Sequence, residues 1–169
     1  MSAFLTSAAD SLDSVIVELR ARERGELHDP KFGQLTLHQG AAGMPSYWEG
    51  RYIWKADCSL VTMRIQAPPE AALPTAEQRE FVEDLERRYS YFMASALVLL
   101  KPAFRHYVGE QANLKTLLQE FLLTGVAVPS LSLRPYVHEF LYRCTTDPSK
   151  AFFVTYIDGW AKKIRVDES

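Results

Sequence analysis

Histidine and cysteine are the residue types that most often bind metals or act as nucleophiles, and this chain spreads them widely. No histidine has another four residues away, the helical spacing that binds zinc, and the cysteines form no Cys-x-x-Cys motif. Gly-x-Ser-x-Gly, Gly-x-Gly-x-x-Gly and Walker patterns are also absent from the sequence. We therefore predict no catalytic residue, metal or cofactor, although the fold could still assemble a site in space. The residues concerned are His28, His38, His106, His138, Cys58 and Cys144.

Two groups of side chains are candidates for binding a partner. The first is an acidic cluster formed by Glu77, Glu80, Glu83 and Asp84. Such a cluster is typical of a solvated helix start, where it complements the helix dipole, and it could also dock a basic protein. Near the end of the chain, basic residues could either protect an edge strand or bind an anion; these are Lys162, Lys163 and Arg165.

The second group is an aromatic stretch in which four rings fall within eight residues. On a strand, Trp48, Tyr52 and Trp54 share one face, whereas Tyr47 and Ile53 share the other. Core packing accounts for part of this density, but protein-binding surfaces also use aromatic and arginine side chains. The binding candidates here are Tyr47, Trp48, Arg51 and Tyr52.

Length and charge narrow the class of protein. The 169 residues carry 19 basic and 21 acidic side chains, and 47% of them are hydrophobic, which predicts one globular domain over residues 1–169. A net charge of −2 gives no general attraction to nucleic acid or anionic membrane. The first twelve residues do not fit a secretory signal, and the most apolar run, Tyr91–Leu100, is too short to span a membrane. We therefore expect a cytoplasmic protein with two buried, reduced thiols, a long-range disulfide being the alternative.

Hydrophobic spacing predicts a helix in residues 1–25 that stops at Gly25, followed by a first group of strands in residues 31–67. That group includes an extended stretch at 34–38 and a hairpin with arms at 47–55 and 58–66. A proline-rich loop over 67–74 then precedes helices in residues 75–124. Thr75 and Gln78 form a capping box at the start of a long helix, which Pro102 should kink or end.

A shorter helix is expected at 113–123, with Gly125 as its cap. The second strand group, residues 128–166, comprises stretches at 128–133, 136–144, 151–157 and 161–166, with Asp158-Gly159 as a hairpin turn. Strands, helices and strands in this order predict an α+β fold. We expect an antiparallel sheet, built from both strand groups, that packs against the long central helix.

The order of several short motifs resembles a group of small bacterial domains of unknown function, of the immunity-protein-like type associated with toxin systems. The resemblance covers residues 29–166. It implies an α+β fold and a cytosolic, non-catalytic binding role, and it leaves the helix at 3–24 outside. The motifs are Phe32-Gly33-x-Leu35, Trp48-x-Gly50, a strand ending near Ile65, Pro74-Thr75 with Gln78, Pro129, and Phe153-x-Thr155-x-x-Asp158-Gly159.

Our leading hypothesis is a protein-binding domain, such as an immunity protein that neutralises a toxin by direct contact. The competing hypothesis is an enzyme or small-molecule-binding domain whose site is assembled in space around Tyr47, Trp48, His38 and Tyr156. A third is an oligomer, for example a homodimer, in which the first helix packs across a subunit boundary.

Overall fold

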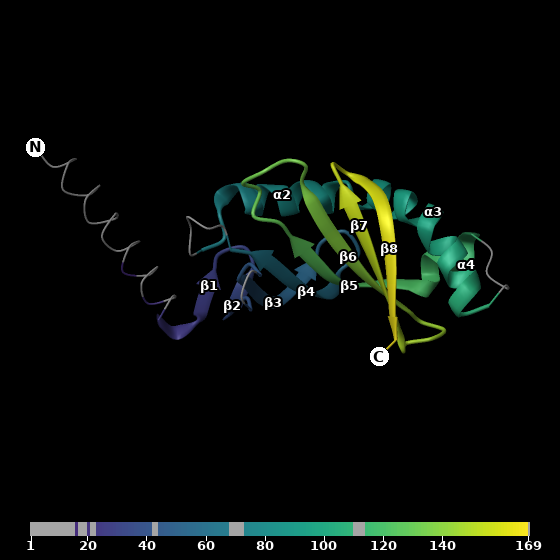
Figure 1. The fold of residues 1–169 in the computed structure, drawn as a ribbon, viewed down its shortest axis with the longest axis horizontal. Helices are drawn as coiled ribbons and strands as arrows, with labels where there is room; N and C mark the ends of the chain where they lie inside the picture. Colours follow the sequence, from purple (N-terminus) through teal and green to yellow (C-terminus); the bar gives the residue numbers. More distant parts are fainter. Residues whose placement is uncertain are drawn as a thin grey trace, which may run out of the picture.

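A computed structural model describes residues 23–41, 44–67, 73–109 and 114–168, together with Ile16 and Arg20. The strands form one eight-stranded sheet whose order follows the chain from β1 to β8. Helices run along one face of this sheet (Figure 1), so the predicted α+β class is confirmed. The strands are β1 (Glu26–Asp29), β2 (Gly33–His38), β3 (Tyr47–Trp54), β4 (Ser59–Gln66), β5 (Phe121–Val128), β6 (Val137–Cys144), β7 (Lys150–Ile157) and β8 (Trp160–Glu168).

The sheet joins the two strand groups through its one parallel pair. All other neighbouring strands are antiparallel, whereas β4 and β5 run parallel. A parallel pair needs a crossover, and here the chain crosses through α2 (Ala76–Arg87), α3 (Tyr89–Tyr107) and α4 (Leu114–Glu120). The predicted sheet with strands from both groups is therefore present.

The sequence patterns did not predict the first hairpin, which β1 and β2 form. β1 pairs with β2 and residues 30–32 form the turn between them, so Asp29-Pro30 marks the end of a strand rather than a break in the chain. The carboxylate of Asp29 accepts hydrogen bonds from the backbone N–H groups of Lys31 and Phe32, at 2.8 and 3.0 Å. This side chain therefore closes the turn. The predicted helix stop at Gly25 is confirmed by its φ of 65°, but most of the predicted helix in residues 1–25 lies outside the described residues.

The central helix begins where the capping box predicts. The Gln78 N–H donates to Thr75 Oγ1 at 3.1 Å, and the Thr75 N–H donates to Gln78 Oε1 at 3.0 Å. The helix is interrupted at Arg88, not at Pro102, which lies inside α3. Apolar spacing does not reveal the interruption because the buried stripe continues across it, from Leu85 to Phe92.

The prediction for residues 113–133 was wrong in two places. The chain is already extended at Phe121, and Gly125 lies inside β5 instead of capping a helix. Residues 129–136 form a loop, so the expected strand at 128–133 is absent. The run FLLTGVAV is short and apolar, and periodicity alone does not distinguish a buried strand from a helix in such a run. Pairing with both β4 and β6 decides in favour of the strand.

The core lies between the helices and one face of the sheet, and aromatic rings make up much of it. Trp48, Trp54, Phe140 and Tyr156 are fully buried there. The cysteines are free, and Cys144 is buried as expected, but Cys58 is exposed in the β3–β4 turn, which corrects the prediction of two buried thiols. The opposite face of the sheet carries no helix from the described residues, and we call it the uncovered face.

Candidate functional site

The acidic cluster lies on the outer surface of α2, and half of its charge is paired. Glu83 accepts a hydrogen bond from Lys31 Nζ at 2.8 Å, and this bond lowers the pKa of Glu83. Asp84 pairs with Arg87 at 2.6 Å and Arg88 at 3.1 Å. Glu77 and Glu80 are exposed and make no ion pair with a described residue. The cluster therefore presents less negative charge than the sequence indicates.

The aromatic stretch divides between the two faces of the sheet as its alternation predicts. Trp48 and Tyr52 are buried in the core, and the Tyr52 hydroxyl donates to Glu86 Oε1 at 3.0 Å. These two side chains are therefore unavailable to a partner of the folded protein. Tyr47 and Arg51 lie on the face away from the helices and are accessible.

The site hypothesised around His38, Tyr47, Trp48 and Tyr156 does not assemble. The rings of His38 and Tyr47 stack, with centroids 5.0 Å apart, on the uncovered face. Trp48 and Tyr156 lie in the core on the opposite face of the sheet. Of the predicted site residues, the fold thus brings Tyr47 and Arg51 to one surface and the four acids to another.

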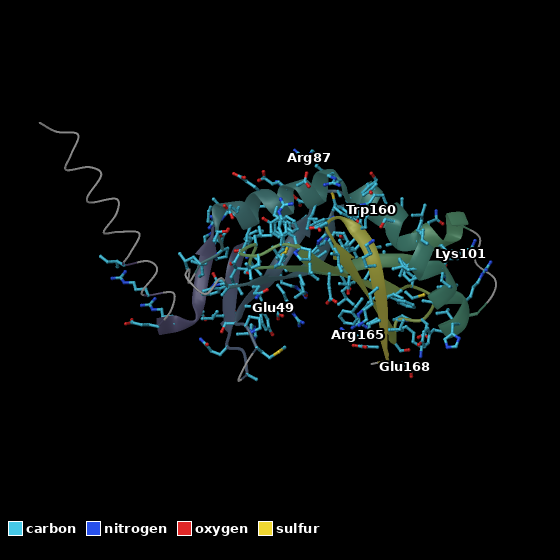
Figure 2. The ribbon with its side chains drawn as sticks, turned by 45° about the horizontal axis from the view of Figure 1, so that its top comes forward. Glu49, Arg87, Lys101, Trp160, Arg165 and Glu168 are labelled. Atoms are coloured by element: carbon cyan, nitrogen blue, oxygen red, sulfur yellow. The ribbon has the colours of Figure 1, made fainter. Side chains whose placement is uncertain are left out.

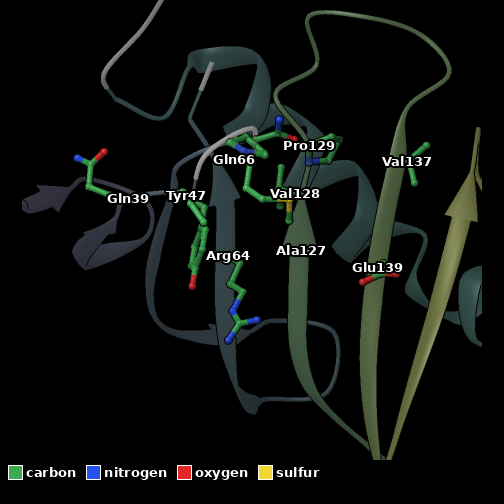
Figure 3. A pocket seen from close by; sticks show the side chains of 13 residues that line it. Gln39, Tyr47, Arg64, Gln66, Ala127, Val128, Pro129, Val137 and Glu139 are labelled. Atoms are coloured by element: carbon green, nitrogen blue, oxygen red, sulfur yellow. The ribbon is translucent and has the colours of Figure 1, made fainter. Parts of the chain in front are cut away.

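The uncovered face contains a groove of about 600 Å³ where β3 to β6 meet the loop that precedes β3. Figure 3 shows Tyr47 and Arg64 on one side, Val137 and Glu139 on the other, and Ala127 between them. A smaller hollow of about 130 Å³ continues along β5 and shares Arg64, Ala127 and Glu139 with the larger one. We call the two together the sheet groove.

Small side chains at the middle of the sheet explain why the groove exists. Ala127 lies opposite Arg64 on one side and Glu139 on the other, so two long side chains flank a methyl group. At Gly125, an added Cβ would come within 3.1 Å of Leu141 Cβ. The groove is therefore hollow over β5, because the side chains of this strand have almost no volume there. In the sequence, this feature corresponds to Gly125-Val126-Ala127, where Gly125 was predicted to cap a helix.

Charges of both signs line the sheet groove. Arg64 Nε donates to Glu49 Oε2 at 2.6 Å, and its guanidinium lies 5.5 Å from the centre of the Tyr47 ring. Across the floor, Glu139 Oε1 accepts a hydrogen bond from Thr155 Oγ1 at 2.8 Å. The groove therefore offers a guanidinium on one wall and a carboxylate on the other.

Apolar side chains extend the uncovered face beyond the groove. Ile53, Leu60 and Leu122 are 62%, 55% and 55% exposed, and Ile53 lies directly opposite Leu60 across β3 and β4. Figure 2 shows Glu49 and Arg165 projecting from this side of the sheet, away from the helices. The face thus combines exposed aliphatic groups with charges, the composition of many protein interfaces.

Comparison of the chain with protein-family models, with curated proteins and with solved structures finds no match in any of the three. The resemblance to immunity-protein-like domains therefore stays a prediction. Among the described residues, no group of His, Cys, Asp or Glu is placed to hold a metal ion. The same part of the chain contains no helix with the length and apolarity needed to cross a bilayer.

Proposed function

We propose that this chain is a non-catalytic protein-binding domain whose interface is the uncovered face of the sheet. The observation that carries this proposal is the sheet groove, which runs between a guanidinium and a carboxylate in a face with three exposed aliphatic side chains. Burying such apolar groups in a complex is favourable, by about 25 cal/mol for each Å² removed from water. The charged walls would then set the orientation of the partner.

The groove supports a protein partner better than the acidic cluster does. Charged groups at both places already have partners, since Glu83 and Asp84 pair with basic residues and Arg64 pairs with Glu49, so the exposed aliphatic side chains beside the groove make the difference. In the groove, Tyr47 and Arg64 are residue types that often dominate binding energies at interfaces. The proposed biological setting is an immunity protein in the bacterial cytoplasm, where it would neutralise a toxin by covering a functional surface.

A capture experiment with three variants tests the proposal. Ala127→Trp fills the floor of the sheet groove, whereas Gln34→Trp places the same ring on the exposed part of β2, on the same face but outside the groove. A double variant, Glu77→Lys with Glu80→Lys, reverses the acidic surface. Each protein is immobilised, exposed to lysate of the source cells, and compared by quantitative mass spectrometry.

We expect one protein to be enriched by the wild-type chain, by Gln34→Trp and by the charge-reversed variant, and to be lost with Ala127→Trp. Its purified form should then bind the wild-type chain in a titration and be inhibited by it. Loss of capture with the charge-reversed variant alone would assign the interface to α2 instead. Recovery of a second copy of this chain would indicate a homodimer, which light scattering would check.

A further inference from the structure

A second pocket lies on the helix side of the sheet, where the interruption between α2 and α3 meets the β7–β8 turn. Its volume is about 290 Å³, close to the lower limit for small-molecule sites. The residues that matter here are Phe81, Arg88, Phe92, Arg134, Tyr136 and His138. None of them lines the sheet groove, so this pocket, which we call the arginine–histidine pocket, is independent of the proposed interface.

A buried histidine that makes no side-chain hydrogen bond to a described residue lines the arginine–histidine pocket. His138 is 2% exposed, and neither of its ring nitrogens has a hydrogen-bond partner among the described residues. Its ring stacks on Tyr156 at 4.9 Å and meets the edges of Phe81 and Phe92 at 5.5 Å. A buried polar group without a partner is costly, so its retention points to a ligand that satisfies it.

His138 is neutral at neutral pH and therefore carries one N–H donor and one acceptor nitrogen. Burial, and to a lesser degree the guanidinium of Arg88, lowers the pKa of His138 to about 4. A neutral imidazole in this position can donate one hydrogen bond without adding charge to the pocket.

Two exposed arginines line the same pocket. The Arg134 guanidinium lies 4.8 Å from the centre of the Tyr136 ring and makes no ion pair with a described residue. Arg88 lies 5.2 Å from the centre of the Phe92 ring and pairs with Asp84 at 3.1 Å. Both guanidiniums are thus held against aromatic rings. Asp84 occupies one nitrogen of Arg88, whereas the N–H groups of Arg134 make no ion pair with a described residue and can bind an anion.

Charged side chains of both signs line the arginine–histidine pocket. Asp84 is shared between Arg88 and Arg87, which lies just outside the pocket. The other acid, Asp158, accepts a hydrogen bond from the backbone N–H of Tyr136 at 3.2 Å. Two guanidiniums and two carboxylates therefore line the pocket, and Arg134 is the lining arginine that makes no ion pair with a described residue.

We propose that the arginine–histidine pocket binds a small carboxylate with an apolar or aromatic body. Arg88 and Arg134 bind the carboxylate, which also accepts a hydrogen bond from the N–H group of His138, while Phe81 and Phe92 contact the body. A single carboxylate matches the one lining arginine without an ion pair to a described residue and the unpartnered N–H of His138, and the aromatic walls exclude a bare, strongly hydrated ion.

Benzoate is the probe that tests this site, with benzamide and inorganic phosphate as matched comparisons. We expect saturable benzoate binding by calorimetry, and at least tenfold weaker binding of the neutral amide and of phosphate, because a charge-assisted hydrogen bond is worth about a factor of ten. Binding should also change the NMR signals of the His138 ring.

Arg134→Ala is the decisive variant because Arg134 is exposed and its loss leaves the core intact. It should weaken benzoate binding at least tenfold, whereas Arg105→Ala, which removes an exposed arginine at the end of α3, should leave it unchanged. The proposal is overturned if benzoate does not bind, if Arg134→Ala binds it as well as the wild-type chain does, or if phosphate binds as tightly as benzoate.

Discussion

The buried histidine predicts a loss of stability in mild acid that a single substitution removes. In the folded chain the pKa of His138 is lowered from the ordinary histidine value of 6.5 to about 4. The unfolded chain therefore binds a proton as the pH falls below 6.5, whereas the folded chain does not do so until the pH approaches 4. The free energy of unfolding must decrease across that range.

The size of the decrease follows from the two pKa values. Between pH 7.5 and pH 5, preferential protonation of the unfolded state should cost about 2 kcal/mol, and the full loss below pH 4 is about 3 kcal/mol. Carboxylates that are stabilised by the fold, such as Asp29, lose their contribution at lower pH, since their pKa values are lowered from an already acidic value. The window from pH 7.5 to pH 5 therefore isolates the histidine.

Urea unfolding of the wild-type chain and of His138→Phe at both pH values measures this contribution. The phenyl ring keeps the stacking position beside Tyr156 but cannot be protonated. We expect the wild-type chain to lose about 2 kcal/mol more than the variant on acidification. Equal losses in the two proteins would refute the reasoning. An NMR titration that showed His138 protonated at pH 6 in the folded chain would refute it independently of the variant.

Three further substitutions test how the elements are joined, with Glu80→Ala on the exposed face of α2 as a control expected to change stability by less than about 0.5 kcal/mol. Gln78→Ala should cost about 2–4 kcal/mol in urea unfolding, because the buried amide caps α2 and donates to the backbone carbonyls of Gln66, at the end of β4, and of Pro129, just after β5. Asp29→Asn should cost about 2–3 kcal/mol, because it removes the charge paired with Arg79 at 2.7 Å; an unchanged denaturation midpoint would contradict this assignment. Gly159→Ala should lower stability by about 1 kcal/mol, since its φ of 86° is strained for alanine, and no change in thermal midpoint would argue against that conformation.

Local signals in the sequence were sufficient for several elements. The capping box at Thr75 and Gln78 located the start of the helix, and Asp158-Gly159 located the last hairpin, because both act over four residues or fewer. Alternation along β3 also separated Tyr47 from Trp48 correctly. The alternation does not indicate which of the two faces the helices cover, so both residues remained binding candidates.

Longer-range pairing decided what the local signals could not. β1 is only four residues long and has no clear pattern of its own, and it exists because β2 supplies hydrogen-bond partners. The start of β5 has an apolar pattern that suits a helix equally well, and parallel pairing with β4 selects the strand. These are tertiary effects, which propensity and spacing do not contain.

By itself, the sequence determined the α+β class, the single sheet from two strand groups, the start of the central helix and the lack of any catalytic motif. Only the tertiary structure decided which surfaces exist. Arg64 and Glu139 are far apart in the chain and flank one groove because β4 and β6 both pair with β5. Likewise, the arginine–histidine pocket exists because the interruption at Arg88 is placed against the turn that follows β7. Such sites depend on contacts between distant segments, and only the folded chain establishes those contacts.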